Sequence, residues 1–336
     1  MKQRKYNSQK DCFWLSVVVI GRNEAKRLPA LFASLPSGED IEWIYVDSCS
    51  EDESTAIALK YGAQVYLVDK DSVYAPGTGR YIGTKEARGY WILYLDGDMV
   101  LRPEFCAFLE SLKNAEDIPT RVAGFVGRTC NYYYDHKYSI VEVRDYVVLP
   151  EREMGPEVGW GKPAGYHGGA VLYRRDLVIN SGNWNPAVYQ LEEIDLYSRI
   201  RARGGLLMAV DLPMADHYTP YLSSMERIKL NFLPSWRGKK LYGAGQVVAA
   251  RFKAGTLLQF IACYPYPFLV FSGLFTAPFL YLLWPPLALL GNAAIAVWLG
   301  LTNKWYFYLV YLGNLLQIFR GLGRYTPLTP SYRKMS

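Results

Sequence analysis

The stretch WILYLDGDMV, residues 91–100, runs from a mostly apolar segment straight into two carboxylates, Asp96 and Asp98, separated by one glycine. A buried strand that ends in paired negative charge is costly unless a positive group meets it. Residues i and i+2 of a strand share a face, so the two carboxylates can converge on one centre. Gly97 lets the backbone turn and approach a ligand closely. The pattern predicts a site for a hard divalent cation, which takes oxygen ligands.

Strand-like runs precede this stretch and alternate with segments of helical spacing. LSVVVI (15–20), IEWIYVD (41–47) and AQVYLVD (63–69) are rich in apolar and β-branched residues, as strands buried on both faces are. A helix is expected over about residues 78–88, just before the strand at 91–96. This alternation predicts an α/β fold with a mostly parallel sheet flanked by helices and ligands at the carboxyl ends of its strands.

A helix start is predicted after the second of these runs. Ser50 and Glu53 in SCSEDES (48–54) have the spacing of a capping box, in which each side chain bonds a free backbone N–H of the other residue. The spacing predicts a helix that begins here and ends near Gly62.

The C-terminal part has a different composition. From Gly255 to Phe319 the chain is almost free of charge, with Lys304 the lone exception. This run is much longer than the roughly 20 apolar residues that span a bilayer as a helix. It breaks at 284–286 and at 302–305, so the number of spans, two or three, stays open. Basic residues on both sides of the run favour an even number of spans.

These features predict four parts. They are a catalytic domain (1–217), a basic and aromatic interfacial segment (218–254), a transmembrane region (255–320) and a basic tail (321–336). We expect a multi-pass membrane protein in contact with lipid, its catalytic domain at the cytoplasmic face of the inner or plasma membrane if the chain is bacterial.

The distribution of charge and the spacing of the cysteines indicate which partners and which compartment to expect. The net charge of +6 is clustered beside the apolar run, which argues against a nucleic-acid partner. The five cysteines are scattered without CxxC or zinc-finger spacing, which fits a reducing compartment.

A second acidic cluster lies in QLEEIDLYSRIRARGG (190–205). Glu192, Glu193 and Asp195 open a segment of helical spacing. Acidic residues in a first helical turn are favourable with the helix dipole, which is the structural interpretation. The functional interpretation is a general base that accepts a proton from an attacking hydroxyl.

Several motifs in order decide between these interpretations. They are SVVVIGRNEAKRL (16–28), IYVDSCSEDEST (44–55), GTGRYIGTKEARGYWILYLDGD (77–98), GGAVLYRRDLV (168–178) and LEEIDLYSRIRARGG (191–205). Over roughly residues 14–217 the chain resembles the family 2 glycosyltransferases of the Rossmann-like GT-A fold. The membrane-anchored layout is similar to that of members which extend exopolysaccharide or lipid-linked saccharides.

The resemblance implies roles for individual residues. Asp47 matches a carboxylate at the nucleoside, and Arg80 a basic residue near the base and phosphates. Asp96 and Asp98 match the DxD pair. The first faces ribose and metal, and the second holds Mg²⁺ or Mn²⁺ on the diphosphate of a nucleotide-sugar donor, for which UDP is favoured.

The base of the family falls on Glu193, where the family usually has aspartate. Glutamate reaches one methylene further, so Glu192 and Asp195 remain alternatives. His217, which follows a strand leading back toward the site, either completes the metal environment or is a structural histidine. Asp47 is followed by Ser48 where the family usually has a second aspartate, so contacts to the nucleobase can differ.

We therefore expect an inverting, metal-dependent transfer of a sugar to a hydroxyl of a lipid-linked or polymeric saccharide. The closest alternative is a polyprenyl-phosphate glycosyltransferase, whose acceptor is already an anion and needs no base. An alternative of another class is a membrane scaffold that binds nucleotide sugars without turnover.

Overall fold

The computed structural model describes residues 13–70, 75–115, 117–146, 162–163, 169–223, 225–226, 229, 243–265, 268 and 316–335. Contacts along the chain divide it into two units. The first unit comprises residues 1–187, 192–221 and 327–336, and the second comprises 188–191 and 222–326. The division at residues 217, 254 and 320 that the sequence predicts stays a prediction.

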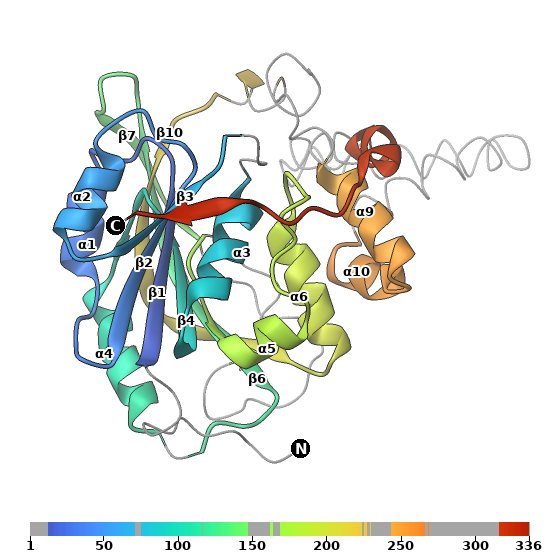
Figure 1. The fold of residues 1–336 in the computed structure, drawn as a ribbon, viewed down its shortest axis with the longest axis horizontal. Coiled ribbons are helices and arrows are strands. Elements are labelled where there is room, and N and C mark those ends of the chain that lie inside the picture. The colour runs from blue at the N-terminus through green and yellow to red at the C-terminus, as the bar shows by residue number, and fades with distance from the viewer. Residues whose placement is uncertain are drawn as a thin grey trace, which may run out of the picture. The chain divides into compact units, whose positions relative to one another are not determined.

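In the first unit, eleven strands of the described residues form one mixed sheet (Figure 1). The strands are β1 (Phe13–Gly21), β2 (Ile41–Asp47), β3 (Gln64–Val68), β4 (Gly89–Asp96), β5 (Met99–Leu101), β6 (Val122–Tyr134), β7 (Ile140–Tyr146), β8 (Lys162–Pro163), β9 (Val171–Arg174), β10 (Leu206–Pro220) and β11 (Tyr332–Lys334). Their order across the sheet is β11-β3-β2-β1-β4-β9-β6-β10-β5, with β7 beside β6 and β8 beside β10.

The predicted parallel strands form the centre of this sheet. β1 pairs in parallel with both β2 and β4, and β2 pairs in parallel with β3. The register sets Gly21 beside Asp47, and Ile20 beside Asp96. The carboxyl ends of β1, β2 and β4 therefore meet at one edge of the sheet, where parallel α/β sheets bind ligands.

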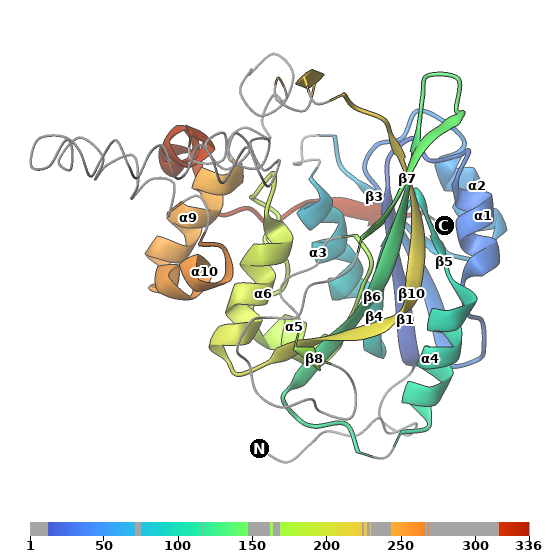
Figure 2. The same ribbon diagram turned by 180° about the vertical axis from the view of Figure 1, so that it is seen from behind.

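Helices cover both faces of the sheet. On one face lie α1 (Leu28–Ser34), α2 (Ser54–Lys60) and α4 (Pro103–Lys113), and on the other lie α3 (Pro76–Glu86), α5 (Arg175–Asn180) and α6 (Glu192–Ala202) (Figures 1 and 2). Because side chains alternate along β1, Val17 and Val19 belong to the core under α1. Val18 points to α3, so closely that a Cβ on Gly83 would lie 2.2 Å from it. α3 therefore packs directly on the strands that carry the acidic residues.

The capping box predicted at Ser50 and Glu53 does not form. The helix begins at Ser54, with Glu53 as an N-cap residue that makes no side-chain capping bond. The Ser50 hydroxyl instead donates to Asp47 at 2.5 Å and accepts the backbone N–H of Asn23 at 2.8 Å. The Ser50 oxygen thus accepts an N–H from the loop after β1 instead of the N–H of Glu53.

A long return strand brings distant residues to the functional edge. β10 pairs antiparallel with β5, which sets His217 beside Met99, and parallel with β6, which sets His217 beside Asn131. The backbone N–H of Tyr218 also donates to the carbonyl of Asp98 at 3.0 Å. His217 is therefore held between strands on both sides.

The described part of the second unit contains short helices. α9 (Gly243–Lys253) packs against residues 318–324, because Gly245 lets the backbone of Ile318 and Gly321 approach closely. α10 (Leu257–Cys263) has seven residues, which rise about 10 Å.

These helices correct the prediction of a multi-pass membrane protein. The hydrocarbon core of a bilayer is roughly 30 Å thick, several times the length of α10, and α9 carries Arg251 and Lys253 in its last turn. Within the described part of the chain, no helix is both long and apolar enough to span a membrane. The predicted C-terminal transmembrane helices are thus unsupported. Most of the predicted region 255–320, namely 266–267 and 269–315, lies outside the described residues.

Candidate active site

The DxD pair sits where β4 turns into β5. Asp96 is the last residue of β4, and Asp98 immediately precedes β5. Between them, the N–H of Gly97 donates to the carbonyl of Ile20 at 2.8 Å. A Cβ on Gly97 would lie 2.8 Å from Cγ of Glu24, so a larger residue here would displace this side chain. The tight turn therefore delivers two carboxylates beside a third one from the loop after β1.

A buried arginine connects Asp96 with the second acidic cluster. The Arg80 side chain, from α3, is only 2% exposed. Its two terminal nitrogens donate to Asp96 at 2.8 Å and to Glu192 at 2.9 Å, and Glu193 lies 3.7 Å away. Its guanidinium also lies over the ring of Trp184, 5.0 Å from the ring centroid. We call Arg80, Asp96, Glu192 and Glu193 the Arg80 cluster.

The charges in the Arg80 cluster do not balance. Burial alone would lower the pKa of Arg80, but Asp96, Glu193 and Glu192 raise it above its usual value, so the guanidinium stays charged. One guanidinium can neutralise only one of three carboxylates. Burial, and next the charge of Glu193, raise the pKa of Glu192 although Arg80 opposes them. Glu192 is therefore the member that takes up a proton most easily.

The two neighbouring glutamates differ in access. Both lie in the first turn of α6. The Glu192 side chain is 4% exposed, whereas that of Glu193 is 23% exposed. The third acidic residue of this turn, Asp195, is fully buried and bonds Arg199 of its own helix at 2.8 Å. Glu193 is thus the member of this turn that solvent or a ligand can reach.

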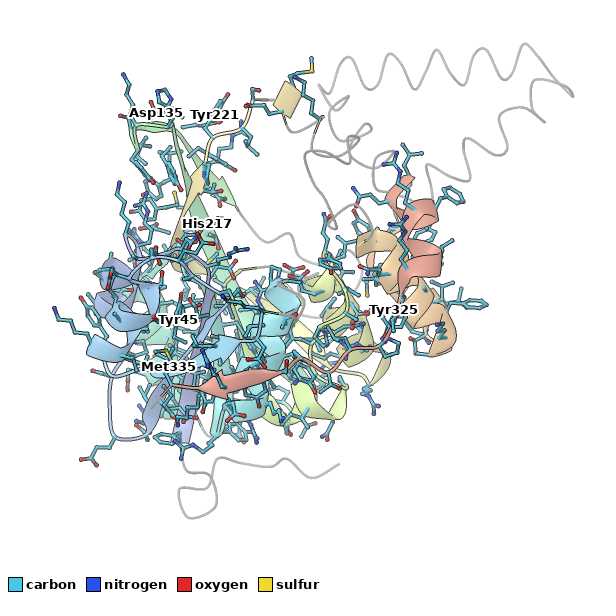
Figure 3. The ribbon with its side chains drawn as sticks, turned by 45° about the horizontal axis from the view of Figure 1, so that its top comes forward. Tyr45, Asp135, His217, Tyr221, Tyr325 and Met335 are labelled. Carbon is cyan, nitrogen blue, oxygen red and sulfur yellow. The ribbon has the colours of Figure 1, made fainter. Side chains whose placement is uncertain are left out.

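Asp98 meets His217 outside the Arg80 cluster. Oδ2 of Asp98 lies 3.3 Å from Nε2 of His217, and each side chain is about a quarter exposed. Nδ1 of the same ring bonds Oδ1 of Asn131 at 2.8 Å. Figure 3 places His217 at the base of the β6–β7 hairpin, whose tip carries Asp135.

Glu24 and Asn131 are two residues of this site that the sequence analysis does not single out. Burial, and next the charges of Asp98 and Asp96, raise the pKa of Glu24 to about 8. The sequence does carry a signal for Glu24. It is an acidic residue shortly after the first predicted strand, just as Asp96 is an acidic residue at the end of the fourth. Asn131 has no such signal, since only the pairing of β6 with β10 brings it to His217.

Asp47, expected at the nucleoside, lies buried at the end of β2. Its Oδ2 accepts the backbone N–H of Ser50 at 2.7 Å, and its Oδ1 accepts the hydroxyls of Ser50 and Tyr45. Both oxygens are thus engaged, by β2 itself and by the turn that follows it.

The carboxylates do not form a finished metal site. Within the described residues, no three histidine, cysteine or acidic side chains are already arranged to hold a cation. However, Oδ1 of Asp98 is buried and, in that same part of the chain, receives no hydrogen bond. A cation that keeps water and phosphate ligands needs only one or two protein carboxylates. The residues present therefore fit a cation that arrives together with a diphosphate.

Comparisons with known proteins find a similar family and a similar fold. Residues 16–182 match the family described as Glycosyl transferase family 2. The 4,4'-diaponeurosporenoate glycosyltransferase of Staphylococcus haemolyticus is 34% identical over 95 residues, which cover 27% of this chain and 25% of that protein. The succinoglycan biosynthesis protein ExoO of Rhizobium meliloti is 38% identical over 68 residues, 20% of either chain. The chain thus spans a quarter or less of the length of these two relatives.

A solved structure shares the fold. A mannosyltransferase from Pyrobaculum calidifontis, in complex with GDP-Man and Mn²⁺, superposes with a TM-score of 0.54 at 14% identity. The match covers 92% of this chain and 87% of that one. The predicted α/β architecture is confirmed as a mixed sheet flanked by helices. Residues 16–182 of this chain are therefore similar to the domains of glycosyl transferase family 2.

Proposed function

We propose that this chain transfers a sugar from a nucleotide-diphospho-sugar, with UDP-sugars the first choice, to a hydroxyl of an acceptor. The family of residues 16–182 supports sugar transfer. The observation that carries the proposal is the position of Glu193, an accessible carboxylate 3.7 Å from the guanidinium that also holds Asp96. One buried residue, Arg80, thus ties a candidate base to the DxD pair.

Glu193 acts as the general base in this proposal. Its carboxylate accepts the proton of the acceptor hydroxyl, and the oxygen attacks the anomeric carbon as the bond to the nucleoside diphosphate breaks on the opposite side. The anomeric centre is inverted in this single displacement. Glu192 is enclosed against Arg80, and Asp195 is turned to Arg199, so neither is as accessible to a hydroxyl.

Asp96, Asp98 and His217 would hold Mg²⁺ or Mn²⁺ beside the diphosphate, and Asp47 and Arg80 would support the nucleotide. The unpartnered Oδ1 of Asp98 supports this assignment, since a buried carboxylate oxygen is costly without a partner. When bound, such a cation supplies positive charge against the charge that develops on the leaving diphosphate.

The acceptor is proposed to be a saccharide, either lipid-linked or polymeric. The relative named for succinoglycan biosynthesis supports a saccharide. The name of the other relative gives 4,4'-diaponeurosporenoate and no saccharide as the compound that it glycosylates, so the acceptor has to be measured. An acceptor phosphate, as in a polyprenyl-phosphate transferase, is already ionised and needs no base.

The test is nucleotide release from UDP-, GDP- and dTDP-sugars with Mn²⁺ and a pool of saccharide and lipid acceptors. We expect Glu193→Gln to lower the rate about 10²- to 10⁴-fold, the usual contribution of a general base. Glu110→Gln, on the exposed side of α4, is the matched control and keeps full activity.

The other outcomes separate the alternatives. Full activity of Glu193→Gln would favour an anionic acceptor such as polyprenyl phosphate. If wild-type protein binds donors but releases no nucleotide with any acceptor, the chain is a binding protein without turnover.

A further inference from the structure

We infer that Asn131 is a positioning residue, which fixes the tautomer of His217 so that Nε2 presents its lone pair to the cation site. This inference deepens the proposed function and rests on it, because the cation belongs to that site. Asn131 does not touch donor or acceptor in this inference. It acts only through the imidazole.

The hydrogen bond between the two residues sets the proton on the ring. Oδ1 of Asn131, an oxygen that can only accept, lies 2.8 Å from Nδ1 of His217. Nδ1 must therefore carry the hydrogen, and a neutral ring then has its lone pair on Nε2.

That lone pair faces another acceptor. Nε2 lies 3.3 Å from Oδ2 of Asp98, and a carboxylate also only accepts. Two acceptors at this separation repel unless a proton on Nε2 or a metal cation joins them, and a cation can take the place of that proton. Oδ1 of the same carboxylate is buried, and no group among the described residues donates to it. A divalent cation that binds both Nε2 and the Asp98 carboxylate resolves these unfavourable contacts.

Strand pairing makes the arrangement rigid. Asn131 and His217 are register partners on the parallel pair β6 and β10, so their side chains leave the same face of the sheet. On its other side β10 pairs with β5, directly after Asp98. Metal-bound histidines usually donate their second ring N–H to an oxygen in this way, which orients the ring and raises its basicity. Asn131 occupies that place here.

The opposite amide orientation makes a contrary prediction. If the Asn131 amide nitrogen faced the ring, it would donate to Nδ1, and Nε2–H would donate to Asp98. His217 would then be a hydrogen-bond donor in a structural pair and could not ligate a cation while neutral. The protonated nitrogen of the ring therefore distinguishes the two arrangements.

Two measurements on the full chain test the inference. The first is nitrogen NMR of ¹⁵N-histidine-labelled, metal-free protein in alkaline buffer, with His217→Gln to assign the signals. We expect a protonated Nδ1 and a bare Nε2 in the wild type and in Asn131→Asp, which can only accept, and a mixture of tautomers in Asn131→Ala. The second is titration with Mn²⁺ followed by EPR.

We expect Asn131→Ala to weaken Mn²⁺ binding about 10- to 100-fold, as loss of such a partner typically does. Asn131→Asp should keep most of the affinity. Asn114→Ala is the matched control, because Asn114 is exposed and its side-chain amide donates to the carbonyl of Glu110 in the adjoining helix. Melting temperatures check that each variant is folded.

Three results would overturn the inference. They are a protonated Nε2 in the wild type, unchanged Mn²⁺ affinity in Asn131→Ala, and equal losses in the alanine and aspartate variants. These outcomes are independent of turnover. A wild type that binds Mn²⁺ in the expected way but releases no nucleotide would defeat the proposed function and leave the role of Asn131 intact.

Discussion

The two aspartates of the DxD pair stand in contrasting surroundings although one residue separates them. Asp96 belongs to the Arg80 cluster, where a guanidinium that is 2% exposed bonds it at 2.8 Å. Asp98 faces His217 at 3.3 Å, and its second oxygen is buried without a donor among the described residues. The first carboxylate has its positive partner within the fold, whereas the second is left incompletely satisfied.

This difference assigns different tasks to the two carboxylates. A satisfied ion pair holds geometry, because it orders side chains from α3, α6 and β4 around one centre. An unsatisfied carboxylate gains most from a ligand, because the ligand removes an existing cost. We therefore expect the loss of the Arg80 guanidinium to lower stability, and changes at Asp98 to act mainly on the response to a cation.

The largest expected effect is that of Arg80→Met. It leaves the buried Glu192 and the partly exposed Asp96 and Glu193 without a counter-charge, and breaking a buried ion pair costs about 3 to 5 kcal/mol. Urea denaturation should show this loss in the free energy of unfolding, together with loss of nucleotide release. Arg128→Met is the control, since Arg128 pairs with the exposed Asp211 at 3.4 Å and such pairs contribute at most about 1 kcal/mol.

A double variant sharpens this test. Arg80→Met with Glu192→Met replaces a buried pair by apolar groups of similar volume, which is often nearly neutral for stability. It should recover part of the lost stability and remain inactive. Equal stability of Arg80→Met and Arg128→Met would contradict a central role of the guanidinium.

The next effect concerns cation binding at Asp98. Mn²⁺ at about 100 times its Kd should stabilise the wild type by roughly 2.7 kcal/mol, and a chelator should reverse the gain. Asp98→Asn should show no such gain, measured as a shift in Tm. A full Mn²⁺ shift in Asp98→Asn, equal to that of the exposed control Asp211→Asn, would rule out the assignment.

The central fold follows from local sequence. The apolar runs at 15–20, 41–47 and 91–96 lie within β1, β2 and β4, and the helix expected at 78–88 is α3 at Pro76–Glu86. A strand buried on both faces needs such a run, so composition alone locates it. Asp47 and Asp96 are predictable for the same reason, because each ends one of these runs.

The rest depends on long-range pairing and on charge balance. His217 reaches Asp98 because β10 pairs with β5, and Asn131 reaches His217 because β6 pairs with β10. No periodicity in the sequence encodes these registers. The apolar run after Gly255 shows where composition misleads. Its low charge predicts membrane spans, and no described helix supports one. Low charge indicates that a segment can be buried in an apolar environment, but it does not determine how long a helix the segment forms.

The smallest expected effect concerns the pH dependence of stability through Glu192. Because burial raises the pKa of Glu192 in the folded protein to about 8, the folded state keeps a proton that the unfolded state releases near its ordinary value. Wild-type stability therefore falls as pH rises from the unfolded pKa toward the folded one.

Glu192→Gln cannot ionise but keeps an acceptor oxygen for Arg80, so its stability should fall less steeply. We expect the variant to gain roughly 1 to 2 kcal/mol over the wild type between about pH 6 and pH 8, measured by urea denaturation at each pH. Glu110→Gln should follow the wild type. Parallel curves for Glu192→Gln and the wild type would mean that Arg80 keeps Glu192 ionised. That result would contradict the proton that we place on Glu192.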